Sequence, residues 1–158
     1  MKRSKITLTR YAMRAPDIEA YMGIGGYQGL KRALKMDKDN VIQEVVDSGL
    51  RGRGGAGFPT GKKWAGVPGG KQAYLVCNAD EGEPGTFKDR FIMEQIPFLI
   101  IEGMTIAGYA VGASKGYIYI RGEYPHVADT IQKALATAQE QNLLGKNILG
   151  SELSFDID

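Results

Sequence analysis

The amino-acid sequence predicts an α/β fold in which crossover helices connect the strands of a parallel sheet. Two short apolar runs, at 73–77 and 116–120, have the length and composition of strands, and the first is predicted to be buried. The residues between the two runs, and those after the second run, repeat their apolar side chains with the period of an α-helix. Because strand and helix alternate, the connections should be right-handed crossovers within one parallel sheet.

Each element follows from its own pattern. The segment from Tyr27 to Met36 places apolar residues on one helical face, and a second amphipathic helix should run from Lys38 or Asp39 to Ser48 until Gly49 stops it. These two helices form a short helical N-terminal region before the sheet. The remaining predictions are strands at 73–77, 116–120 and 154–157, a helix at 87–113 broken or kinked at Pro97, and a helix at 124–141.

The composition indicates one globular domain and excludes several functions. The chain has 158 residues, of which 43% are hydrophobic and 24% charged, so a real core can form. A net charge of +2 gives no reason to expect a nucleic-acid partner. With one cysteine and one histidine, the chain cannot build a disulfide framework or a thiolate metal site alone, and we expect no metal site. A reducing, cytoplasmic setting is the default prediction.

No membrane span or secretory signal is expected. The longest apolar stretch, 91–111, contains Glu94, Pro97 and Glu102, whereas a span needs about 20 apolar residues with few charges. We therefore predict a buried helix there. The basic residues at 1–5 are not followed by the apolar run of a signal peptide.

The segment from Gly49 to Trp64 is the most informative, because it holds six glycines and four basic residues. Glycines allow the backbone to approach a ligand closely, and Arg and Lys supply charge against an anion. Residues 52–57 match G-x-G-x-x-G, but they follow a predicted helix instead of a strand. The Walker pattern fails as well, since Ala56 and Lys63 stand where glycine and Ser or Thr are required.

An acidic segment lies downstream, at 77–90. Its residues Asn78 to Glu83 should lie at the carboxyl end of the first strand, where open α/β sheets bind ligands. The sequence therefore predicts one site with two polarities, basic and glycine-rich on one side and acidic on the other.

These motifs resemble the flavin-bearing, NADH-oxidising subunit of respiratory complex I. Residues 51–64, 78–90, 120–124 and 144–147 carry the resemblance, which extends from about Gly26 to the C-terminus. Similar modules occur in NAD-reducing hydrogenases and NAD-dependent formate dehydrogenases. The resemblance implies a Rossmann-like sheet, with 1–25 as an N-terminal extension and 26–158 as the N-terminal portion of an FMN/NADH-binding domain. That domain is incomplete relative to the family, whose second flavin loop, ubiquitin-like domain and four-cysteine helical domain should follow.

The resemblance also implies cofactors and site residues. The cofactors are FMN and NAD(H), and no catalytic side chain is expected because hydride passes directly between nicotinamide C4 and flavin N5. The glycine loop would pack against the flavin, the acidic loop would bind flavin and nucleotide, and an aromatic residue would stack on adenine. A second family aromatic is replaced here by Gly66. The predicted binding residues are Gly52, Arg53, Gly54, Gly55, Phe58, Lys63, Asn78, Asp80, Glu81 and Glu83.

The predicted function is that of an FMN-dependent NADH dehydrogenase (diaphorase) module that passes electrons to an iron–sulfur cluster. A 4Fe-4S cluster is expected only in the C-terminal part of such subunits, and the implied partners are iron–sulfur subunits, including a thioredoxin-like 2Fe-2S protein. The module would be cytoplasmic or peripheral to a membrane complex. The alternative is a non-catalytic nucleotide-binding, phosphate-binding or assembly module left by truncation.

Several site residues also have plain structural interpretations. On residue chemistry alone, Glu81 and Glu83 could form a solvated acidic turn, and Phe58 before Pro59 could be a hydrophobic anchor. Cys77 is interpreted as a buried small apolar residue and not a nucleophile. We expect His126 at the surface and Trp64 in the core.

Overall fold

The computed structural model describes residues 14–67 and 72–158. Within them, β1 (Tyr74–Ala79), β2 (Lys115–Ile120) and β3 (Asp156–Ile157) form one parallel sheet in the order β1-β2-β3. The helices are α1 (Ile18–Gly23), α2 (Gln28–Ala33), α3 (Lys38–Asp47), α4 (Thr60–Ala65), α5 (Lys88–Gln95), α6 (Pro97–Val111) and α7 (Pro125–Glu140), with a 3-10 turn at Ile148–Gly150. The predicted α/β class and parallel sheet are confirmed.

The strand register brings the carboxyl ends of β1 and β2 together. Tyr74 pairs with Lys115 at one end and Ala79 with Ile120 at the other. Asp80 and Arg121 therefore follow neighbouring strand ends. The strand β1 ends two residues later than predicted, so Asn78 belongs to the strand and not to the loop after it.

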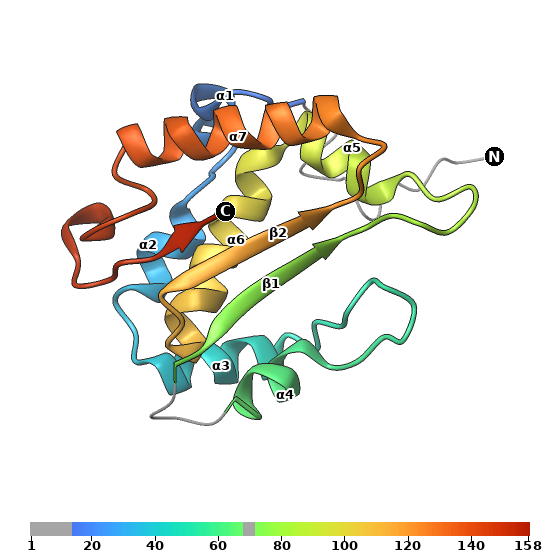
Figure 1. Ribbon diagram of the computed structural model, residues 1–158. Helices are drawn as coiled ribbons and strands as arrows, with labels where there is room; N and C mark the ends of the chain where they lie inside the picture. Colours follow the sequence, from blue (N-terminus) through green and yellow to red (C-terminus); the bar gives the residue numbers. More distant parts are fainter. Residues whose placement is uncertain (1–13, 68–71) are drawn as a thin grey trace.

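Helices cover one face of the sheet, and the other face is open in the described residues. Figure 1 shows α6 behind β1 and β2 with α7 crossing above it, and α6 contacts both strands. On the opposite face, Tyr74, Val76, Tyr117 and Tyr119 are 41–63% exposed. The prediction that the first strand is buried is therefore wrong for this face, because strand alternation directs every second apolar side chain away from α6.

The helix α6 is the centre of the core. Ile101, Met104 and Ala107 are buried along it, and two glycines allow close packing nearby. A Cβ atom on Gly108 or Gly116 would lie 2.6 or 2.8 Å from the ring of Phe155. That ring therefore fixes how closely β2 and the C-terminal segment approach α6.

The predicted break at Pro97 is confirmed. The helices α5 and α6 meet there at 99°, and Ile96, with φ −148° and ψ 57°, lies outside the α region that a following proline disfavours. No single helix in residues 14–67 and 72–158 is long and apolar enough to cross a membrane. The bent pair α5 and α6 passes that test only in length and composition.

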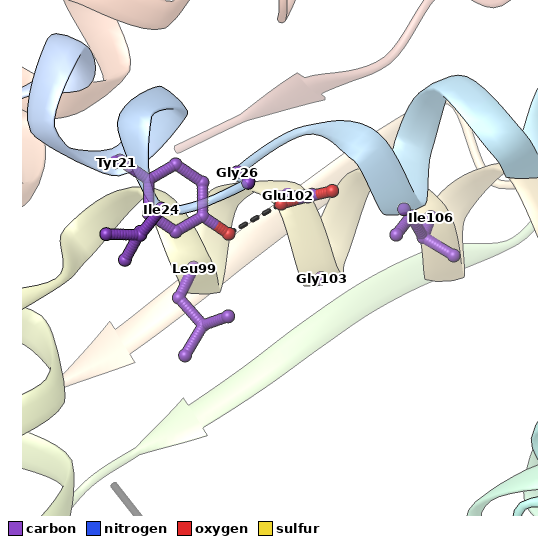
Figure 2. Close-up of a pocket in the computed structure, with 9 residues that line it drawn as sticks. Tyr21, Ile24, Gly26, Leu99, Glu102, Gly103 and Ile106 are labelled. Atoms are coloured by element: carbon purple, nitrogen blue, oxygen red, sulfur yellow. Dashed lines mark hydrogen bonds between the residues drawn. The ribbon is translucent and has the colours of Figure 1, made fainter. Parts of the chain in front are cut away.

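A buried carboxylate ties the N-terminal helices to α6. Glu102 accepts hydrogen bonds from the Tyr21 hydroxyl at 2.5 Å, the Tyr27 amide at 2.8 Å and the Leu30 amide at 3.0 Å. Figure 2 shows the first of these bonds in a cavity of about 230 Å³. Ala15, Ile18 and Tyr21 join the main core. Residues 14–25 of the predicted N-terminal extension thus pack with the rest, whereas residues 1–13 lie outside the described part.

Candidate functional site

A cleft of about 510 Å³ opens beside the carboxyl end of β1. Two segments that are distant in sequence line it, the glycine loop between α3 and α4 and the acidic loop between β1 and α5. The lining residues are Arg53, Gly54, Gly55, Asn78, Asp80, Glu83, Thr86, Lys88 and Asp89. The structure thus brings the basic and acidic motifs together, as the two-polarity interpretation predicted.

The glycine loop is a small closed structure. Arg51 and Pro59 form an antiparallel bridge, and the Gly52 amide donates to the Phe58 carbonyl at 2.9 Å. The Arg51 guanidinium also donates to the Gly57 carbonyl at 3.0 Å. These bonds hold the ends of the loop and leave its tip, residues 53–55, to line the cleft.

Within the described residues, neither crowding nor backbone conformation requires glycine at position 54. A Cβ atom built there meets nothing within 4 Å, and its φ is outside the left-handed region that favours glycine. By contrast, its neighbour Gly55 has a φ of +109°, which a side chain would strain. Because Gly54 lines the cleft, a flat ligand lying on bare backbone gives a reason for glycine that the fold does not.

The acidic loop presents carboxylates to the same cleft. Asn78 accepts a hydrogen bond from the Asp80 amide at 3.1 Å, an Asx turn that begins the loop as β1 ends. Glu83 follows, and its carbonyl accepts from the Thr86 amide in a turn that contains Gly85 at a φ of +81°. The side chains of Asp80 and Glu83 are exposed, so both carboxylates can accept hydrogen bonds from a bound molecule.

Glu81 is placed differently from its neighbours. Its side chain is only 2% exposed, and its two oxygens accept from the Asp89 amide at 2.8 Å and the Arg90 amide at 3.2 Å. It therefore caps the N-terminus of α5, where Phe87 in the N-cap position makes no side-chain bond. Sequence reasoning missed this structural contact, and Glu81 does not line the cleft.

Three other predicted site residues lie outside the cleft lining. Gly52 forms the base of the glycine loop. Phe58 is 57% exposed where that loop leads toward α4, and Lys63 is exposed on α4. Their predicted ligand contacts stay predictions.

The cleft also includes residues that the sequence did not single out. Thr86, Lys88 and Asp89 line it at the start of α5, and Lys88 pairs with Asp89 at 2.6 Å. Their place in the acidic motif was the available signal. Arg53 and Lys88 bring positive charge to a cleft that Asp80, Glu83 and Asp89 also line.

The plain interpretations of single residues hold only in part, because Glu81 is buried instead of solvated and Phe58 is 57% exposed instead of anchored in the core. His126 is exposed, and its Nε2 lies 3.0 Å from a Glu94 oxygen. Cys77 is half-buried against the main core, and burial, with a smaller contribution from Asp89, raises the pKa of its thiol. Trp64 is half-buried and packs against the cluster around Val41. In residues 14–67 and 72–158, no group of three or more His, Cys, Asp or Glu could hold a metal ion.

The fold and the cleft define the class of the protein. It is a parallel α/β domain with a glycine loop and an acidic loop that line a cleft beside the carboxyl end of β1. The chain belongs to the Nuo51 FMN-binding domain family, whose match covers residues 45–157. The predicted family is therefore confirmed.

Named relatives agree with this membership. The chain is 52% identical to an NADH-quinone oxidoreductase subunit of Aquifex aeolicus over 145 residues, which cover 91% of this chain and 34% of that protein. It is 50% identical to the NADP-reducing hydrogenase subunit HndC of Solidesulfovibrio fructosivorans over 143 residues, 89% and 29% of the two chains. A crystal structure of NAD⁺-reducing [NiFe]-hydrogenase in the H₂-reduced state aligns with a TM-score of 0.70 at 37% identity, covering 84% and 22%. The chain thus spans about a third of the length of its curated relatives.

Proposed function

We propose that the chain is the N-terminal part of an FMN-dependent NADH dehydrogenase module, and that FMN and NADH bind in the cleft between its glycine loop and its acidic loop. The observation that carries this proposal is the cleft itself, lined from both motifs in a member of an FMN-binding family. Its volume of about 510 Å³ suits a cofactor site. The relatives named for NADH or NADP chemistry support the nucleotide.

The donors and acceptors of the cleft suit both molecules. Arg53 provides positive charge for a phosphate group, and Lys88, which pairs with Asp89, provides a second cation at the cleft. Asp80 and Asn78 provide oxygens that can accept hydrogen bonds from ribityl or ribose hydroxyls. The bare backbone at Gly54 leaves room for a ring to lie flat against the loop.

The chain's own residues would bind and orient, while the cofactor supplies the chemistry. When bound, FMN would accept hydride from NADH and release electrons singly to an iron–sulfur cluster. The protein's task is then to hold two rings in stacking contact, which needs no side-chain acid or base. Among the predicted residues, Glu83 is suited to the nucleotide and Asp80 to the flavin. Gly52, Phe58, Lys63 and Glu81 belong to the same proposal as neighbours of the cleft.

The proposal extends to the assembly. Relatives are subunits of NADH-quinone oxidoreductases and of a hydrogenase, so this chain would act with electron-transfer partners. We assign the iron–sulfur partners, including a thioredoxin-like 2Fe-2S protein, and a 4Fe-4S cluster to the longer assembly. A cytoplasmic location, peripheral to any membrane, remains part of this proposal.

The test is to titrate the purified chain with FMN, follow the flavin absorption bands, and then add NADH without oxygen. We expect FMN to bind and NADH to bleach it, with Asp80→Ala weakening FMN binding and Arg32→Ala, a surface control on α2, leaving it unchanged. FMN binding that requires the C-terminal part of a relative's subunit would support a site completed by that part. Nucleotide binding without bleaching would favour the non-catalytic module. No binding in either preparation would overturn the proposal.

A further inference from the structure

Arg121 joins the carboxyl ends of the two neighbouring strands. It directly follows β2, and its Nη1 donates to the carbonyl of Glu81, beyond the end of β1, at 2.7 Å. The two residues are 40 positions apart in sequence. This bond is the direct link from Arg121 to the acidic loop that lines the cleft.

The Arg121 guanidinium is itself held in one orientation. Its Nε and Nη2 donate to the two Glu123 oxygens at 3.1 and 2.7 Å, a forked pair. The Tyr124 ring lies against it, with 5.5 Å from the guanidinium carbon to the ring centroid, and Arg90 approaches the same ring at 5.6 Å. The hydrogen bond with Glu123, together with smaller contributions that include Asp80, raises the pKa of Arg121, so the side chain stays charged.

Hydrogen bonds hold both the main chain and the side chain of Glu81, the residue that Arg121 contacts. The Glu81 carbonyl accepts from Arg121, while the Glu81 carboxylate caps α5 through the Asp89 and Arg90 amides. Asp80 and Glu83 flank this fixed point and line the cleft. Their positions therefore depend on a bond that comes from another strand.

We propose that Arg121 is a positioning residue of the nucleotide site, which acts through the Glu81 carbonyl to hold Asp80 and Glu83 at the cleft. The contacts described above support the positioning of the loop by Arg121. The effect of this positioning on nucleotide binding rests on the proposed function. Arg121 does not line the cleft, so it acts on a ligand through the loop alone.

The first test measures the loop without any ligand. Hydrogen exchange is followed in the wild-type chain, Arg121→Met, Arg121→Lys and Arg32→Met, the last removing an exposed arginine that pairs with Glu44. We expect the Asp89 and Arg90 amides to exchange on the order of tenfold faster in Arg121→Met. Arg121→Lys should resemble it, because an ammonium cannot keep the fork, and Arg32→Met should match the wild type. Wild-type exchange of these amides in both Arg121 variants would overturn the proposal.

The second test separates positioning from general stability. Arg121→Met should weaken NADH binding on the order of tenfold, the effect of one charge-assisted hydrogen bond. Glu83→Gln should weaken it in the wild type but change it less than about twofold in Arg121→Met, where the carboxylate is no longer held. Equal effects of Glu83→Gln in both backgrounds would refute the positioning role. If NADH binds neither to the wild-type chain nor to the chain supplemented with the C-terminal part of a relative's subunit, the proposed function fails and hydrogen exchange alone decides the role of Arg121.

Discussion

Gly54 allows the cleft to be tested without disturbing the fold. A methyl group at Gly54 would meet no atom of residues 14–67 and 72–158 within 4 Å, and its φ is outside the left-handed region. Gly54→Ala therefore fills space that only a ligand would use. Two other glycines provide matched controls. Gly23 is equally open but lies at the end of α1, away from the cleft, whereas Gly55 lies in the cleft at a φ of +109°.

The magnitudes follow from these geometries. Gly54→Ala and Gly23→Ala should raise the free energy of unfolding by no more than about 1 kcal/mol, because alanine restricts the unfolded chain. Gly55→Ala should lower it by about 1–2 kcal/mol, since its backbone is left-handed. For FMN affinity, a methyl group that prevents close ring contact should cost about 1.4 kcal/mol or more, which is at least about tenfold.

The assay combines urea denaturation with quenching of flavin fluorescence. We expect Gly54→Ala to retain wild-type stability and lose FMN affinity, while Gly23→Ala retains both. Wild-type FMN affinity in a stable Gly54→Ala chain would refute the idea that a ligand occupies the face of this residue. A large loss of stability in Gly54→Ala would contradict the open space that surrounds this glycine.

Three further predictions concern buried groups. Glu81→Ala should lower the free energy of unfolding by about 1–3 kcal/mol in urea denaturation, because two α5 amides lose their acceptor, while the exposed Glu83→Ala changes it by less than about 0.5 kcal/mol. Glu102→Ala should lower it by about 3 kcal/mol, since a tyrosine hydroxyl and two amides lose this acceptor, the first of these bonds being the one drawn in Figure 2; a loss under about 1 kcal/mol would contradict these three contacts. Cys77 should react with iodoacetamide more slowly than a free thiol at neutral pH, because its pKa is raised above the ordinary value, and mass spectrometry should show normal reactivity in urea.

Much of the fold could be predicted because local signals and tertiary packing agree. The amphipathic pattern of α3 and the proline between α5 and α6 each specify their elements directly. The open face of β1 could not be predicted, since Tyr74 and Val76 are residue types typical of a core. Strand composition shows that a residue can be buried, but not what covers it.

The site was predictable as motifs but not as contacts. The glycine and acidic segments carry their chemistry in their own residues, so the sequence indicated that they belong to one site. It could not show that Glu81 turns inward to cap α5, because the capping partners lie eight and nine residues away across a loop. Arg121 was equally hidden, since its contact with Glu81 depends on strand register.

Amide chemical-shift mapping of the chain during titration with FMN and then NADH tests the central claim most directly. Binding in the cleft predicts shifts that concentrate at Arg53, Gly54, Gly55, Asn78, Asp80 and Glu83, with little change around Glu102. Shifts concentrated in the cavity at Glu102, or none at saturating FMN and NADH, would contradict binding in the cleft.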